Sequence, residues 1–414
     1  MKRNAPDFIT AFLEWCGESE APTEYLRWCA FSLLGAACGR RIFTPRGLGS
    51  DTVTYPNLYV MLVGPSGNYK TYAIRRVIKI LQGTSYADKL NLYAGHVTHS
   101  GMYDAMRITE RKRDKEGNVI SITYPHRKHF YLLNNELAND VGNLENADQL
   151  IRALTELYDM GPFFDDRSRG AGHVHIEEFS INWLSATTPE WLMKSITKDA
   201  FLGGFFGRLV MVYEGYTNRR IMQVPHNPNE TTLYNYLTKR IDEIFFMHGA
   251  INRTPEAIDV EKEWYESRED VDEADYTMSS WRRQYDLVLK MEILLALSRH
   301  KKVIDADDAV EAIQLVQRVA RWQQDFLPTL QRGIANVRVE ELFRWLKVRK
   351  RCTRTELTRV AYSRFGMKAQ ELEQVVRTWL EAELVEAEER SRRNGGTIYR
   401  ISEGGKNRAP TDTE

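Results

Sequence analysis

Residues 55–81 read YPNLYVMLVGPSGNYKTYAIRRVIKIL, and this stretch decides the fold that the sequence predicts. Leu58 to Val63 is a short apolar run of the kind found in buried parallel strands. The loop GPSGNYKT follows at 64–71, and apolar residues then recur at helical spacing over 73–81. Strand, glycine-bearing loop and helix in this order predict a P-loop, in which backbone N–H groups and a helix N-terminus hold a polyphosphate.

The loop supplies the predicted nucleotide-binding residues. Lys70 is expected to neutralise the β- and γ-phosphates of ATP, and the Thr71 hydroxyl to ligate Mg²⁺. The consensus G-x-x-x-x-G-K-[ST] has glycine where Tyr69 stands; a side chain is compatible with that position if its φ is helical, with Gly67 supplying the flexibility. The predicted ATP-binding set is Gly64, Pro65, Ser66, Gly67, Asn68, Tyr69, Lys70 and Thr71.

Length and composition indicate an ordinary globular chain. Its 414 residues are enough for two or three domains, and 57 basic residues balance 57 acidic ones, so nucleic-acid binding requires local basic patches. No run of 18 apolar residues predicts a membrane span, and the amino-terminal sequence has no signal-peptide core, so we expect a cytoplasmic protein without a membrane partner. The four cysteines form no C-x-x-C pair and predict neither disulfides nor a zinc site.

The pattern along the chain predicts an α/β fold with several parts. A helical segment at 1–50 precedes a P-loop core at 51–227, built as a parallel sheet with helices on both faces, and a helical lid follows at 228–335. Within the core we expect strands at 94–97 and 130–133, and a helix over 101–113. A basic run ends in a hairpin turn at 115–118; it either lines a nucleic-acid channel or is a solvated surface hairpin.

Two further strand ends carry candidate catalytic residues. After the strand at 130–133, Glu136 is expected to polarise the attacking water, whereas Asn135 stands where a Walker B acid would hold Mg²⁺. An amide oxygen can still ligate Mg²⁺ but lacks the negative charge of a carboxylate, so ATP binding with weak hydrolysis is the alternative. After the strand at 181–184, Thr187 or Thr188 is expected to act as a sensor beside the γ-phosphate, or else to cap the next helix.

Basic residues further along supply two more predicted roles. Arg208 follows a glycine-rich turn and is the candidate finger for a neighbouring subunit's γ-phosphate; the alternative is a local ion pair. In the lid, Arg282, Arg283 or Lys290 would act as a second sensor, and nothing in the sequence selects among them.

The last part of the chain has a different pattern. Residues 336–402 predict three helices and a β-wing, a winged helix whose third helix would enter the major groove while Arg392 and Arg393 touch phosphate. Residues 333–408 contain 17 Lys and Arg against 11 Asp and Glu, a local net charge of +6 that favours nucleic acid. A protein-binding winged helix is the alternative, and 403–414 is expected to be a disordered tail.

Taken together, residues 7 to about 325 resemble phage and prophage P-loop ATPases described as replicative helicases or primase-helicases. The resemblance rests on the ordered set YPNLYVMLVGPSGNYKT, YLLNNELANDVG, LTELYDMGPFF, WLSATTPEWL and GGFFGRLVMVY. It implies a ring-forming, hexameric AAA+/RecA-like ATPase that uses ATP and Mg²⁺ to move along single-stranded or forked DNA in a bacterial host cell. Phosphate roles for Lys70 and Thr71, a catalytic role for Glu136 and a finger role for Arg208 are part of that implication.

Two classes of function follow from these patterns. The first is a DNA-dependent motor of phage or mobile-element replication, namely a hexameric helicase working with replication partner proteins. The second is a nucleotide-gated DNA-binding initiator or helicase loader with weak ATP hydrolysis, which the asparagine at position 135 favours. A defence or packaging ATPase is a third possibility, for which the chain carries no nuclease motif.

Overall fold

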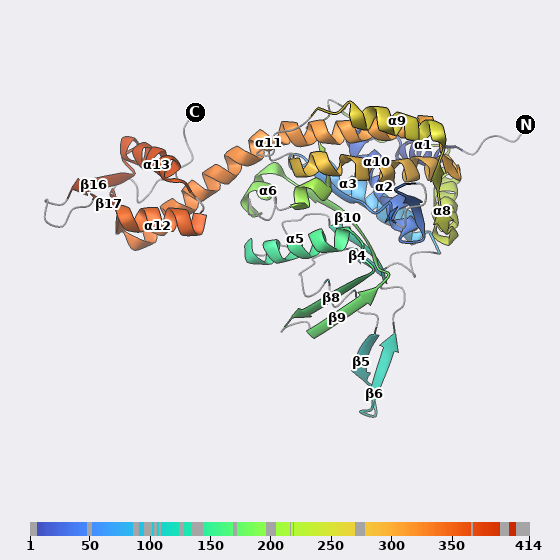
Figure 1. Ribbon diagram of the computed structural model, residues 1–414, viewed down its shortest axis with the longest axis horizontal. Helices are drawn as coiled ribbons and strands as arrows, with labels where there is room; N and C mark the ends of the chain where they lie inside the picture. The colour runs from blue at the N-terminus through green and yellow to red at the C-terminus, as the bar shows by residue number, and fades with distance from the viewer. Residues whose placement is uncertain are drawn as a thin grey trace, which may run out of the picture. The chain divides into compact units, whose positions relative to one another are not determined.

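The computed structural model describes residues 6–47, 52–85, 91–94, 102, 106, 109–123, 128–134, 144–168, 172–195, 204–215, 217, 219–269, 278–365, 367–389 and 397–402. Two compact units divide the chain, Met1–Pro328 and Thr329–Glu414. The fold is of the mixed α/β kind (Figure 1). Among the described helices, none is long and apolar enough to cross a membrane.

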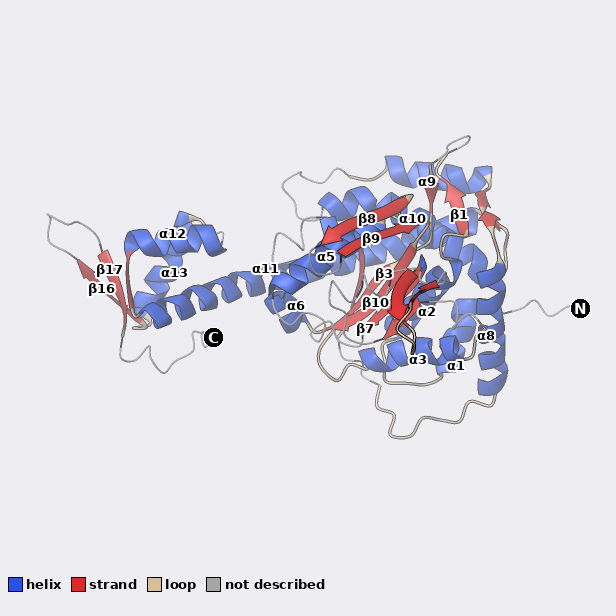
Figure 2. Ribbon diagram, turned by 90° about the horizontal axis from the view of Figure 1, so that it is seen from below, coloured by secondary structure: helices blue, strands red, loops and turns tan. Residues whose placement is uncertain are grey.

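A five-stranded parallel sheet forms the centre of the first unit (Figure 2). Its order is β11–β3–β10–β7–β4, with bounds Leu209–Tyr213, Tyr59–Val63, Ser180–Thr187, His129–Asn134 and Asn91–Ala94. All five residues of β3 and all eight of β10 are buried, as expected of central strands covered on both faces. The buried runs predicted around positions 60, 132 and 183 are therefore confirmed as neighbouring strands.

Helices cover both faces of this sheet. On one face, α2 (Thr23–Cys38) contacts β3, β7, β10 and β11, with α3 (Lys70–Gln82) beside it. On the other face lies α5 (Leu144–Tyr158), whose Leu154 carbonyl accepts a hydrogen bond from the Tyr59 hydroxyl. Alternate residues of β3 therefore meet different helices, as the two-residue period of a strand requires.

The helices outside residues 51–227 pack into the same apolar core. This core includes residues of α1 (Phe8–Cys16), α2, α8 (Glu230–Phe246), α9 (Pro255–Glu266), α10 (Met278–Ser298) and the first part of α11 (Ala306–Arg349). Short pairs β1 (Ile42–Pro45) with β2 (Val53–Thr54) and β12 (Gly249–Ala250), and β13 (Asn252–Arg253) with β14 (Val303–Ile304), lie outside the main sheet. The amino-terminal helices thus supply one wall of the core.

Two hairpins interrupt the sheet connections. One is β8 (Phe163–Ser168) with β9 (Gly172–Glu177), and the other is β5 (Thr109–Arg113) with β6 (Val119–Thr123). The helix expected over 101–113 is therefore wrong at its end, because 109–113 pairs with a strand instead. The predicted turn is confirmed, and the Asp114 side chain closes it by accepting from the N–H groups of Glu116 and Asn118 at 3.0 and 2.8 Å. The strand expected at 94–97 shares only Ala94 with β4, and positions 95–97 lie outside the described residues.

The second unit has its own small core. It contains the last part of α11, then α12 (Arg354–Phe365) and α13 (Ala369–Glu381). Strands β15 (Arg351–Thr353), β17 (Thr397–Ile401) and β16 (Val385–Glu389) form an antiparallel sheet in that order. Phe343 and Trp379, with ring centroids 5.1 Å apart, lie in its buried cluster. Three helical segments and a β-hairpin thus occur in the predicted order.

Candidate functional site

The loop between β3 and α3 lies at the carboxyl edge of the parallel sheet. Val63 ends the strand, Lys70 begins the helix, and the six residues between them form the turn. In sheets of this kind ligands bind outside the carboxyl ends of the strands. Within the described chain no side chain caps the amino end of α3, which leaves a helix N-terminus open toward an anion.

The backbone of Tyr69 differs from the expectation of a helical φ. It has φ 57° and ψ 18°, in the left-handed region, while Gly67 also has a positive φ of 79°. Tyr69 therefore adopts the conformation for which the consensus uses glycine, and this costs a side-chain-bearing residue about 1–2 kcal/mol. The turn geometry is retained although the glycine is not.

Asn68 anchors the loop from below. Its side-chain N–H group donates to the carbonyls of Glu214 and Gly215, both at 3.0 Å, and reaches the Tyr25 hydroxyl at 3.2 Å. Tyr25, on α2, donates to the carbonyls of Val63 at 2.7 Å and Glu214 at 3.1 Å. Asn68 is 2% exposed, and these bonds make its side chain an anchor of the loop, while the residue still belongs to the wall of the cavity above it.

Gly64 is required by the same close packing. A Cβ atom built on it would lie 2.2 Å from the Tyr25 hydroxyl, 2.5 Å from the Glu214 carbonyl oxygen and 2.9 Å from the Asn68 side-chain nitrogen. Real Cβ atoms do not approach other atoms so closely, so no side chain fits without moving this cluster. Neither Gly64 nor Pro65 lines the cavity above the loop.

That cavity has a volume of about 360 Å³. Its walls are residues 66–72 of the loop and first helical turn and residues 186–188 at the end of β10. The Lys70 ammonium donates to the carbonyls of Gly64 and Pro65, both at 2.6 Å, so it lies over the loop's own backbone. Lys70, Thr71 and Ser66 are thus brought together as predicted.

Thr187 joins the same cavity from the neighbouring strand. It ends β10, lies level with Val63 in the register of the two strands, and is buried. Thr188 behaves differently, because its hydroxyl accepts from the Trp191 N–H at 3.3 Å at the start of α6 (Pro189–Ser195). Both threonines line the cavity, and the Thr187 hydroxyl donates to the Thr188 carbonyl at 3.3 Å, so the Thr188 hydroxyl is the one that caps the helix.

The predicted Walker B position follows the strand on the other side of β10. The end of β7 is Asn134, whose side-chain oxygen accepts from the Trp183 indole N–H at 2.9 Å. Asn135 and Glu136 lie outside the described residues. Since β10 lies between β3 and β7, the sheet order puts Thr187 between the loop and the end of β7.

Arg208 lies at the opposite edge of the sheet from the loop. It precedes β11, a strand parallel to β3, whereas the loop follows β3. Its guanidinium donates to the Asp159 carboxylate at 2.5 Å and to the Gly204 carbonyl at 2.9 Å, and its side chain is 11% exposed. The local ion pair, left open as the alternative to a finger, is therefore present.

Two of the second-sensor candidates lie at this same edge. Arg283 donates to the other oxygen of Asp159 at 3.2 Å. Lys290 is buried, donates to the side-chain and backbone oxygens of Asn57 at 2.6 and 2.9 Å, and lies 4.0 Å from the Tyr158 ring centroid. Burial lowers the pKa of Lys290 well below its usual value. Neither Arg283 nor Lys290 lines the cavity above the loop at 64–69. The third candidate, Arg282, is exposed to solvent.

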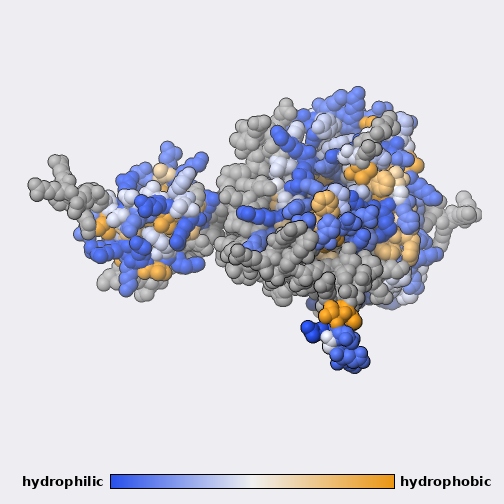
Figure 3. Space-filling model, turned by 60° about the horizontal axis from the view of Figure 1, so that its bottom comes forward, coloured by the Kyte–Doolittle hydropathy of each residue, from blue (hydrophilic) through white to orange (hydrophobic). Residues whose placement is uncertain are grey.

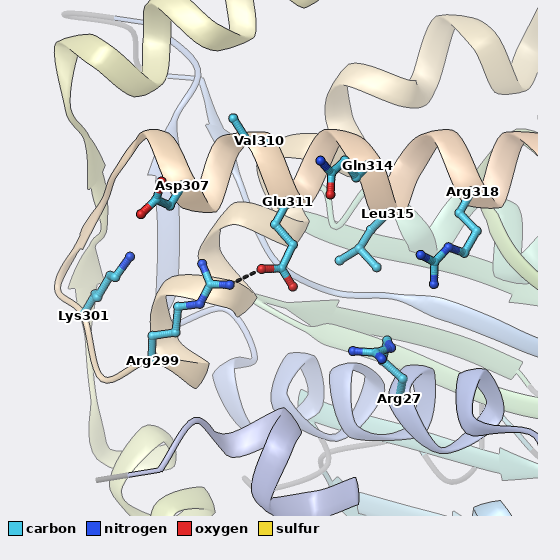
Figure 4. A pocket seen from close by; sticks show the side chains of 9 residues that line it. All are labelled: Arg27, Arg299, Lys301, Asp307, Val310, Glu311, Gln314, Leu315 and Arg318. Atoms are coloured by element: carbon cyan, nitrogen blue, oxygen red, sulfur yellow. Dashed lines mark hydrogen bonds and ion pairs between the residues drawn. The ribbon is translucent and has the colours of Figure 1, made fainter. Parts of the chain in front are cut away.

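A larger cavity of about 600 Å³ lies between α2 and the first turns of α11 (Figure 4). Its basic side chains already have protein partners: Arg299 pairs with Asp308 and Glu311, Lys301 with Asp305, and Arg27 and Arg318 both with Glu24. Basic and acidic groups thus compensate each other around it. The smaller cavity remains the candidate site.

Two surfaces carry the basic residues predicted to meet nucleic acid. The tip of the β5–β6 hairpin projects from the first unit, with exposed Arg113 and Lys115 beside the apolar Val119 and Ile120 (Figure 3). In the second unit the basic helix is α12, with three arginines and one glutamate, whereas α13 has three glutamates and one arginine. Arg392 and Arg393 lie outside the described residues.

Sequence reasoning missed the residues that hold these sites in place. Tyr25 and Asp159 are each separated from their partners by tens of residues along the chain, and although Asp159 lies in the stretch LTELYDMGPFF, nothing in that stretch indicates a pairing with Arg208. Glu20, which accepts a hydrogen bond from the Tyr69 hydroxyl, is another such residue. Only the folded chain brings these groups together, so no local pattern could have identified them.

Neither a scan against models of known protein families nor a search of curated proteins finds a match to this chain.

Proposed function

We propose that this chain is an ATP-binding P-loop protein that acts on DNA, as a ring-forming replicative helicase of the phage ATPase type. One observation carries the proposal: a lysine-bearing turn with glycine-like geometry joins a buried parallel strand to an uncapped helix, beside the hydroxyl of Thr187. This combination supplies N–H donors, a cation and a polar sensor on one side of a cavity, which suits a polyphosphate.

The residues present fit ATP and Mg²⁺. The Lys70 ammonium rests on two carbonyl oxygens, which are weaker partners than phosphate oxygens, so a bound triphosphate would draw it into the cavity. The first-turn N–H groups of α3 would hold the phosphates, and the Thr71 hydroxyl would be the protein's ligand to Mg²⁺, with Asn135 as the predicted second. The metal would neutralise charge developing on the transferred phosphoryl group.

Glu136 and Thr187 have the catalytic roles in this proposal. Glu136 would orient and polarise the attacking water. Thr187 would contact the γ-phosphate from the end of β10, the strand between β3, which leads into the loop, and β7, which leads to Glu136. The order β3–β10–β7 supports this division because it puts the three strand ends side by side at one edge. Arg208 would complete the site of a second copy rather than its own.

DNA binding would use the hairpin tip and the second unit, read as a winged helix. Charge argues against α13 as the helix that enters the major groove, because Arg377 is paired with Glu381 at 2.9 Å and two further glutamates accompany them. Exposed Arg359 and Arg364, with Tyr362 at 73% exposure, make α12 the better phosphate-binding face. We therefore move the proposed DNA contact from the third helix to the second.

A second candidate function is a nucleotide-gated DNA-binding initiator or loader with little turnover. Two observations favour it: Asn135 lacks the charge of a Walker B acid, and Arg208 is held by Asp159. In this alternative ATP would drive assembly on DNA without brisk hydrolysis.

The test is ATP hydrolysis by the full chain, with and without single-stranded DNA, for the parent, Lys70→Ala and Lys79→Ala. Lys79 is a matched control, since it belongs to the same helix and its half-exposed ammonium lies 3.5 Å from Glu230. Turnover that rises with DNA, vanishes in Lys70→Ala and survives in Lys79→Ala supports the motor, and separation of a forked duplex then supports the helicase. ATP binding that depends on Lys70 without turnover supports the gated binder, while turnover unaffected by Lys70→Ala refutes both.

A further inference from the structure

Tyr69 is the residue of the loop that departs from the glycine pattern, and it does so in a strained conformation. Its φ of 57° belongs to the left-handed region, which glycine adopts freely and tyrosine does not. Strained residues concentrate at sites where the side chain has a task. The strain at Tyr69 therefore indicates that the phenol ring has a role at this position that glycine could not fill.

The ring is both fixed and accessible. Its hydroxyl donates to the carboxylate of Glu20, which also accepts from the Ile221 N–H at 2.7 Å, so the far end of the side chain is tied to two backbone segments. The residue remains 44% exposed and lines the cavity above the loop. Tyr72, one residue past Thr71, lines the same cavity and points its hydroxyl to the Cys16 carbonyl at 3.3 Å. Two anchored aromatic rings therefore flank the proposed phosphate site.

We infer that Tyr69 forms the base-binding part of the nucleotide site, with its ring stacking on the base of the nucleoside triphosphate whose phosphates the loop holds. This inference rests on the proposed function and goes beyond the loop's predicted contact with phosphate. A ring held at one end and exposed on the other is pre-ordered for stacking, so little side-chain freedom is lost on binding.

Stacking also determines which nucleotides the site accepts. Every base has an aromatic face, so a stacking platform selects for a base without reading its hydrogen-bonding edge. The Glu20 carboxylate is occupied by the Tyr69 hydroxyl and the Ile221 N–H, and the Glu20 backbone carbonyl by the Thr217 hydroxyl at 2.7 Å. The site should consequently bind ATP and GTP with similar affinities and inorganic tripolyphosphate more weakly than either.

The experiment compares two probes, ATP and inorganic tripolyphosphate, each with Mg²⁺, by titration calorimetry on the full chain. Tyr69→Gly removes the ring and relieves the backbone strain, so the variant keeps the fold and the turn. We expect it to weaken ATP binding by about tenfold or more, within the range measured for stacked bases, and to leave tripolyphosphate binding within twofold. Tyr69→Phe keeps the ring and should stay within about threefold of the parent for both probes.

Each other outcome overturns a defined part of the reasoning. ATP binding that is unchanged in Tyr69→Gly, or ATP and tripolyphosphate binding that fall by the same factor, would mean that the ring only shapes the loop, and would overturn the inference alone. If Tyr69→Phe lowers ATP affinity as much as Tyr69→Gly does, the effect belongs to the hydrogen bond with Glu20, and the stacking inference is overturned. A parent protein that binds neither probe would overturn the proposed function, and this inference with it.

Discussion

Gly64→Ala tests how the nucleotide-binding loop is held against the rest of the protein. The added methyl would lie 2.2 Å from the Tyr25 hydroxyl and 2.5 Å from the Glu214 carbonyl oxygen, and the second of these is backbone that cannot swing aside. Either the loop lifts or the hydroxyl leaves its position. In both cases the bonds from the Tyr25 hydroxyl to Val63 and Glu214 are lengthened or lost.

The expected destabilisation follows from these contacts. Overpacking a tight site costs about 1–3 kcal/mol, and each weakened buried hydrogen bond costs about 0.5–1.5 kcal/mol. We therefore expect the free energy of unfolding of the first unit to fall by roughly 3 kcal/mol, and ATP affinity to fall because the displaced turn no longer presents its N–H groups together. Urea unfolding followed by tryptophan fluorescence measures the first effect, and calorimetric titration with ATP measures the second.

Gly215→Ala is the matched control, because a Cβ there meets nothing within 4 Å. It should change the free energy of unfolding by less than about 0.5 kcal/mol, the usual range for an open surface site. A Gly64→Ala variant as stable as Gly215→Ala, with unchanged ATP affinity, would refute the argument that Tyr25 and the Glu214 carbonyl close the space around Gly64.

Three further predictions concern other parts of the chain. Burial, reinforced by the nearby Glu261 charge, raises the pKa of Glu292 to about 9, so stability should fall by up to about 1.4 kcal/mol per pH unit between about pH 5 and 9. Glu292→Gln should flatten that slope in urea unfolding, and an unchanged slope would contradict an un-ionised Glu292. Asp159→Asn releases Arg208 and should raise turnover of the assembled protein roughly two- to fivefold, as expected for an ion pair whose carboxylate is half exposed. A steady-state ATPase rate equal to the parent's would contradict competition between Asp159 and phosphate. The double variant Arg359→Ala, Arg364→Ala should reduce the slope of log K for duplex DNA against log salt concentration by about 2. Arg377→Ala on α13 should leave that slope unchanged. A reduced slope in Arg377→Ala and an unchanged slope in the double variant would assign the DNA contact to α13.

Local chemistry explains what the sequence could predict about the site. The apolar run before Gly64, the turn residues and the helical spacing after Lys70 are all contained in about 25 consecutive residues, so strand, loop and helix follow from them. The buried runs that became β7 and β10 are equally local. The sequence predicted that these runs belong to one parallel sheet, whereas the order β3–β10–β7 comes from the structure.

Long-range contacts explain what the sequence could not predict. The anchoring of Asn68 depends on Tyr25, 43 residues earlier, and on the carbonyl of Glu214, 146 residues later. The positive φ of Tyr69 is imposed by the turn around it, whereas tyrosine's own preference is for negative φ. The false extension of a helix through 109–113 has a similar cause, since only pairing with 119–123 makes that segment a strand.

The proposed loop and Arg208 lie at opposite ends of the parallel strands, and this determines which nucleotide Arg208 can contact. The loop follows Val63, and Arg208 precedes Leu209, which pairs with Tyr59 in the parallel register of β3 and β11. At about 3.3 Å per residue, the length of the strand separates them by roughly 16 Å, farther than an arginine side chain extends. Arg208 therefore cannot contact a phosphate held by its own loop. If it acts in hydrolysis, it acts on the nucleotide of another copy, and mixing Lys70→Ala with Arg208→Ala protein should then restore part of the activity that each variant lacks alone. Mixtures no more active than the separate variants would leave Arg208 with the role that its bond to Asp159 indicates, which is to hold the start of β11 against the end of α5.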